Sequence, residues 1–83
     1  MAVNVQTVLD DRVAKYVNRV KEQCHATEAA VVRDLVESGY EEIIRRLHAR
    51  YARGELTFRA VAGEVGLSVR ELYELFEQKG LPT

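Results

Sequence analysis

Residues 3–9, Val-Asn-Val-Gln-Thr-Val-Leu, decide how the rest of this sequence is interpreted. The segment alternates for part of its length and is rich in β-branched residues, which is typical of a β-strand. One predicted face carries Val3, Val5, Thr7 and Leu9, and the other carries Asn4, Gln6 and Val8. No second strand pattern follows, and a lone strand leaves its backbone groups unpaired. We therefore expect the same strand of a second copy to pair with it.

Two helices are predicted after the strand. Asp10 is suited to cap a helix over residues 11–23. The apolar face of this helix consists of Val13, Tyr16, Val17, Val20 and Cys24. Because Cys24 falls on that face, we expect it in the core and not as a nucleophile. Thr27 is suited to cap a second helix, which Gly39 is expected to end.

Three further helices are predicted in the second half. The first begins near residue 41 and ends at Gly54. Thr57 caps a short helix, and Ser68 with Glu71 forms a capping box for the last one. The expected fold is therefore mainly α, with one N-terminal strand paired across a homodimer and a C-terminal unit of three helices.

Size and composition exclude several classes of protein. The chain has 83 residues, 47% of them hydrophobic and 30% charged, which is the balance of an ordinary globular protein and leaves no room for a large enzyme cleft. It has a single cysteine, and no apolar run approaches the ~20 residues that span a membrane. We expect a cytoplasmic protein that makes no membrane contact. A chain this short often needs a partner to complete its core, so a homodimer, or a tetramer, is expected.

The alternating segment, the helix opened by Asp10-Asp11 and the Thr27-capped helix together resemble the ribbon-helix-helix family of DNA-binding proteins, such as Arc and MetJ. The resemblance covers residues 3–40. It implies that two chains pair their strands into an antiparallel ribbon that enters the DNA major groove. Asn4, Gln6 and Val8 would then contact bases, because Asn and Gln bond adenine edges and an apolar group touches the thymine methyl.

The resemblance also implies a phosphate contact at the start of the second helix, where Ala26, Thr27 and Glu28 would offer backbone N–H groups. The family often has glycine at the turn occupied here by His25, and its ribbons often carry Arg or Lys, which this ribbon lacks. The net charge of the chain is −1, and only residues 41–54 are locally basic, with four Arg against two Glu. Arg45 and Arg46 either contact the DNA backbone or form a solvated face with i,i+4 pairs to Glu41 and Glu42.

The second half resembles a helix-turn-helix unit, since Ala62, Gly66, Ser68 and Leu72 stand at the spacing of that motif. Residues 54–82 are also similar to a family of small prokaryotic proteins, some of them proposed antitoxins. The acidic exposed side of the last helix argues against DNA contact there. We instead expect a protein-binding surface, for which the candidate residues are Arg70, Tyr73 and Glu74.

Neither catalysis nor metal binding is predicted, so we expect a non-enzyme without cofactors. The histidines are His25 and His48, and the adjacent Cys24-His25 pair does not have a zinc-ligand spacing. The prediction is a ribbon-helix-helix domain at 1–40 that binds double-stranded DNA, followed by an interaction domain at 41–83. An antitoxin that represses its own operon and captures a toxin fits these features, and a plain repressor fits nearly as well. The alternative is a dimeric adaptor that does not bind nucleic acid.

Overall fold

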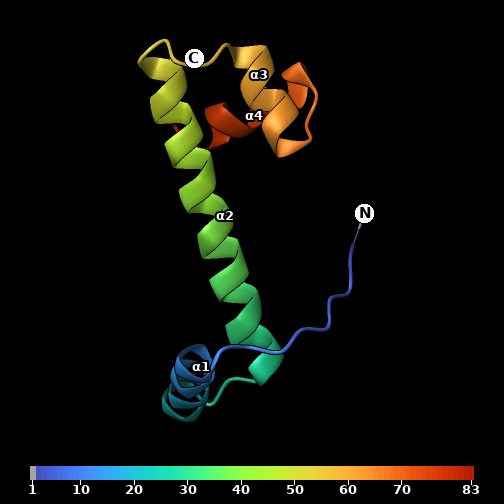
Figure 1. Ribbon diagram of the computed structural model, residues 1–83, viewed down its shortest axis with the longest axis vertical. Coiled ribbons are helices and arrows are strands. Elements are labelled where there is room, and N and C mark those ends of the chain that lie inside the picture. The colour runs from blue at the N-terminus through green and yellow to red at the C-terminus, as the bar shows by residue number, and fades with distance from the viewer. Residues whose placement is uncertain (1) are drawn as a thin grey trace. The chain divides into compact units, whose positions relative to one another are not determined.

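The computed structural model describes residues 2–83, and in these residues the chain is mainly helical, as predicted. Its elements are α1 (Asp11–Cys24), α2 (Glu28–Ala52), α3 (Phe58–Val65) and α4 (Val69–Gln78), as Figure 1 shows. The chain divides into two compact units, one ending at Glu37 and the other covering Ser38–Thr83. Each unit is described separately below.

Local capping groups fix both ends of α1. The side chain of Asp10 accepts a hydrogen bond from the backbone N–H of Arg12, which confirms the predicted N-cap. At the other end His25 adopts the left-handed conformation, with φ 51°, and its N–H donates to the carbonyl of Lys21. Histidine is one of the few residues besides glycine that is enriched in this conformation, so the chain turns here without a glycine.

The second and third predicted helices are one helix, and the prediction that Gly39 ends the second was wrong. α2 begins after Thr27, whose hydroxyl accepts the N–H of Ala30 at 3.1 Å, so the predicted cap is confirmed. Gly39 does not have the positive φ that would end a helix, unlike Gly54 and Gly66. A glycine inside a helix costs about 1 kcal/mol relative to alanine, which is small compared with the hydrogen bonding of a 25-residue helix.

The first unit has a small core. Val17 is 2% exposed and Val31 is 4% exposed. Tyr16 is 54% exposed and Cys24 is also exposed, so the expectation that Cys24 is a core residue was wrong. The reason is that residues 2–37 of a single chain provide no further element to cover the rest of the apolar face of α1.

The second unit has a more complete core. Ile44 on α2, Val61 and Ala62 on α3, and Leu72 and Phe76 on α4 form one buried cluster. Within this unit α3 and α4 lie beside the C-terminal turns of α2 (Figure 1). The C-terminal part of α2 therefore shares one continuous hydrophobic core with α3 and α4, although it is not the separate helix that was expected.

The C-terminal segment returns to α2 through two side chains. Nε2 of His48 lies 2.6 Å from the carbonyl oxygen of Pro82, and the hydroxyl of Tyr51 donates to the carbonyl of Thr83 at 2.7 Å. The ring of His48 also meets Phe76 edge-on at 5.1 Å. These contacts hold the residues after α4 against the same helix that supplies Ile44 to the core.

The turn between α3 and α4 has the predicted helix-turn-helix chemistry. Gly66 ends α3 with φ 72°. Ser68 accepts the N–H of Glu71, and the Glu71 carboxylate accepts the N–H of Ser68 at 3.0 Å, which confirms the capping box. Thr57 caps α3 in the same way as Ser68 caps α4, by accepting the N–H three residues later.

The capping box leads to a prediction about pH. The hydrogen bond from the Ser68 backbone holds the pKa of the Glu71 carboxyl below its ordinary value of 4.5. Because the pKa is lower in the folded state, this carboxylate stabilises the protein above pH 4.5, and that contribution is lost as the pH falls through the folded pKa. We expect Glu71→Gln, which keeps an acceptor oxygen but does not titrate, to show a smaller fall in melting temperature between pH 7 and pH 3 than the wild type. An unchanged fall would show that this carboxylate does not contribute.

Candidate nucleic-acid interface

The N-terminal segment is extended and exposed. Residues 2–9 contain no strand, and no backbone hydrogen bond joins them to another part of the described chain. Val3 and Val5 are each 75% exposed and Val8 is 96% exposed. Asn4 and Gln6 are exposed as well. All three candidate base-contacting residues, Asn4, Gln6 and Val8, are therefore accessible, while several large apolar side chains beside them are uncovered.

A hollow of about 700 Å³ lies between this segment and the helices of the first unit. Its lining residues are Val5, Gln6, Thr7, Leu9, Ala14, Glu28, Ala29 and Val32. Val5, Thr7 and Leu9 belong to the predicted inner face of the strand. Gln6 belongs to the outer face but also reaches the hollow, so the two faces are not fully separated in a single chain.

A phosphate contact was predicted at the start of α2. Some of the polar groups there already form hydrogen bonds or ion pairs within the chain. The N–H of Ala26 donates to the carbonyl of Lys21 at 3.2 Å, so it serves the end of α1. The Thr27 hydroxyl caps the helix, and the Glu28 carboxylate lies 3.9 Å from the ammonium group of Lys21. The backbone N–H groups of Thr27, Glu28 and Ala29 have no acceptor within residues 2–83, as is usual at the start of a helix. Those three N–H groups remain for an anion.

Arg45 and Arg46 belong to the second unit, whereas the residues discussed so far belong to the first. Nε of Arg46 donates to Glu42 at 3.0 Å, which is one of the i,i+4 pairs of the solvated-face alternative. The other pair of that alternative, Glu41 with Arg45, is not formed, because Glu41 is paired with Lys79 directly after α4. That hydrogen bond lowers the pKa of the Glu41 carboxyl from its ordinary value. Arg45 is exposed, with no ion pair recorded in residues 2–83.

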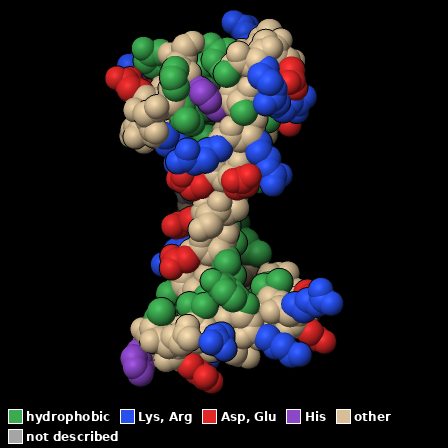
Figure 2. Space-filling view, turned by 90° about the vertical axis from the view of Figure 1, so that its left-hand side faces the viewer, with side chains coloured by type: hydrophobic (Ala, Val, Ile, Leu, Met, Phe, Trp, Pro, Cys, Tyr) green, Lys and Arg blue, Asp and Glu red, His purple; other side chains and the backbone are tan. Residues whose placement is uncertain are grey.

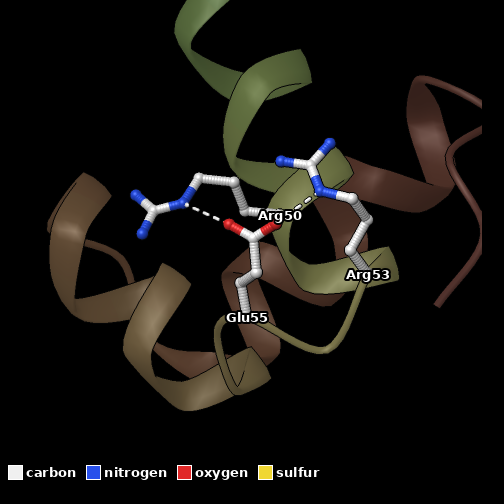
Figure 3. A network of polar contacts seen from close by, with 3 residues as sticks. All are labelled: Arg50, Arg53 and Glu55. Atoms are coloured by element: carbon white, nitrogen blue, oxygen red, sulfur yellow. Dashed lines mark hydrogen bonds and ion pairs between the residues drawn. The ribbon is translucent and has the colours of Figure 1, made fainter.

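The other two arginines of the basic stretch, Arg50 and Arg53, both contact the carboxylate of Glu55, which was not among the predicted site residues. Figure 3 shows Glu55 between Arg50 and Arg53, with one carboxylate oxygen directed to each. The hydrogen bond from Arg53 lowers the pKa of Glu55, and the same bond raises the pKa of Arg53. The signal that could have found this network is the acidic residue directly after Gly54, since a left-handed glycine there turns the chain back toward α2. Two carboxylates, Glu42 and Glu55, therefore offset half of the positive charge of the four arginines in this stretch.

The candidate protein-binding residues lie together on the exposed side of α4. Arg70 Nε lies 3.6 Å from Glu74 Oε1, and both side chains are largely exposed. Tyr73 is 51% exposed and borders a shallow hollow with Glu77 and the residues that follow Gly80. This side of α4 combines an aromatic ring with acidic groups, which suits a protein partner more than a phosphate backbone.

Residues 2–83 bring together no group of three or more His, Cys, Asp or Glu side chains able to hold a metal ion. Among the described helices, none has the length and apolar character needed to cross a membrane. No family model matches the chain, and no curated protein and no solved structure matches it either. The functional proposal therefore depends on the residues of this chain alone.

Proposed function

We propose that the protein is a homodimeric, sequence-specific DNA-binding regulator of the ribbon-helix-helix type. The observation that carries this proposal is the N-terminal segment, which is extended, has no backbone partner in its own chain and exposes Val3, Val5 and Val8. A single strand is not stable in water, and the same strand of a second copy supplies the missing hydrogen bonds. In the dimer, residues 3–9 of the two chains form an antiparallel ribbon.

The apolar surface of the first unit supports a second copy as the partner. Val13 and Tyr16 on α1 are 41% and 54% exposed, and Val36 on α2 is 66% exposed. Figure 2 shows hydrophobic side chains gathered on the surface rather than enclosed. Pairing two copies would cover these residues and fill the hollow lined by Val5 and Leu9, which stabilises a dimer by about 25 cal/mol per Å² of apolar area buried.

The ribbon would read DNA through its outer face. Asn4 and Gln6 can each bond an adenine edge through two hydrogen bonds, and Val8 can contact a thymine methyl. The free N–H groups of Thr27, Glu28 and Ala29 would receive a phosphate, with Lys21 offsetting the charge of the Glu28 carboxylate. Of the four arginines in residues 41–54, Arg45 is the one available for the DNA backbone without breaking an ion pair.

The second unit would bind a protein. Tyr73, with the Arg70–Glu74 pair beside it, forms an exposed surface that suits a basic partner. An antitoxin that represses its own operon would use the first unit on DNA and this surface on its toxin. Such a regulator acts in the cytoplasm.

The second candidate function is a dimeric adaptor that does not bind nucleic acid. It is favoured by the charge arrangement, since the net charge is −1 and Arg46, Arg50 and Arg53 are all paired with glutamates. Mobility-shift assays on a pool of random duplexes at 50 and 200 mM salt distinguish the two. Binding that weakens steeply with salt supports the regulator, and no binding at 50 mM supports the adaptor.

The identity of the reading residues gives a further prediction. After selection of a preferred duplex from the random pool, we expect Gln6→Ala to lose about 1–3 kcal/mol of binding free energy on that duplex and to relax the base preference. Arg45→Ala is the matched comparison, because it should weaken preferred and random duplexes alike and reduce the salt dependence. If the Gln6→Ala variant kept the base preference of the wild type, the proposal that the ribbon contacts the bases would be contradicted.

A further inference from the structure

We propose that the second unit carries a separate self-association surface on α2, centred on Ile43, at which two copies of the chain pack with their α2 segments antiparallel. This surface goes beyond the DNA-binding proposal and does not depend on the N-terminal ribbon. It is defined by Tyr40, Ile43 and Leu47, with Glu42 and Arg46 along one border. All five residues belong to the unit Ser38–Thr83.

The surface is apolar and uncovered where the rest of the unit is well packed. Ile43 is 50% exposed and Tyr40 is 43% exposed, whereas the adjacent Ile44 is completely buried in the core. Leu47 is partly buried and packs against that core. The spacing of Tyr40, Ile43 and Leu47, three and then four residues, places them on one stripe of the helix, the arrangement that packs against another helix.

The charged border identifies the occupant as a second copy. Arg46 and Glu42 are exposed, with side-chain exposures of 72% and 57%, and within the chain they pair with each other. A two-fold axis near Ile43 would place Tyr40 opposite Leu47 of the second copy, and would bring each Arg46 beside the second copy's Glu42. The charged border is thus complementary to itself, as a two-fold interface requires.

Cysteine cross-linking tests the geometry directly. In a Cys24→Ser background, which removes the exposed native thiol, we expect Ile43→Cys to form a disulfide-linked dimer at least ten times faster than Val69→Cys at the same protein concentration. Val69 is a matched control because it is similarly exposed, at 44%, but lies on α4. A disulfide needs Cα atoms within about 7 Å, which the two-fold axis provides only at residue 43. Equal rates for the two variants would overturn the proposal.

Charge exchange tests the complementarity. We expect Arg46→Glu to raise the dissociation constant of this association at least tenfold in sedimentation equilibrium, since glutamates would face one another. The double variant Glu42→Arg with Arg46→Glu should restore association to within threefold of the wild type, because it again places opposite charges across the two-fold axis. Failure of this rescue, with helix content unchanged by circular dichroism, would overturn the proposal. The ribbon lies in the first unit, whereas Ile43 lies in the second. A failure of the wild type to bind DNA would therefore contradict the proposed function but not this self-association surface.

Discussion

Replacing Phe76 with alanine is expected to destabilise the protein by about 3–5 kcal/mol, the range for removing a buried aromatic side chain. Phe76 has no exposed surface. Its ring meets His48 edge-on at 5.1 Å and Phe58 edge-on at 5.7 Å, so the substitution removes contacts to α2 and α3 together. Because small domains are stable by only about 5–15 kcal/mol, this loss is a large fraction of the total.

Urea denaturation followed by circular dichroism measures this effect. Tyr73→Ala is the matched control. This substitution removes an aromatic ring of similar size from the same helix, but Tyr73 is 51% exposed. We expect the control to change the free energy of unfolding by less than about 1 kcal/mol. Similar losses for the two variants would contradict the placement of Phe76 at the centre of the second core.

Replacing Val5 with aspartate is expected to raise the dissociation constant of the proposed ribbon dimer more than about a hundredfold, which corresponds to about 2.8 kcal/mol. In a single chain Val5 is 75% exposed, so the carboxylate remains in water and the chain still folds. In the dimer the same position faces the helices beside the hollow, and burying an unpaired charge there is strongly unfavourable.

The control places the same charge one residue away. Asn4→Asp lies on the opposite face of the strand, because successive side chains alternate, and should change dimerisation by less than about threefold. Analytical ultracentrifugation of both variants and the wild type measures the difference. If both variants dissociate equally, or neither does, the two faces of the ribbon are not distinct and the DNA-reading role of Asn4 and Gln6 loses its basis.

The features that the sequence predicted well depend on groups close together in the chain. The caps at Asp10, Thr27, Thr57 and Ser68 were all confirmed, since each requires one side-chain oxygen and an N–H two or three residues later. The charge network around Glu55 was missed, because it depends on how the chain turns after α2 rather than on a regular helical spacing.

The structure corrected three further predictions. Gly39 did not end a helix, because α2 continues through it from Glu28 to Ala52. One of the two interpretations of the basic stretch paired Glu41 with Arg45 on its own helix, but Glu41 pairs with Lys79, 38 residues away. Cys24 was expected in the core, but residues 2–37 of one chain do not cover it.

The amino-acid sequence by itself determined the helical class, the helix caps and the unpartnered alternating segment, because these follow from hydrogen bonding and periodicity within a few residues. Only the tertiary structure decided which side chains are buried and which charges are neutralised. The burial of Phe76 against His48 and the pairing of Glu41 with Lys79 both require distant segments to meet. Such contacts depend on how the helices pack together, which a pattern of neighbouring residues does not predict.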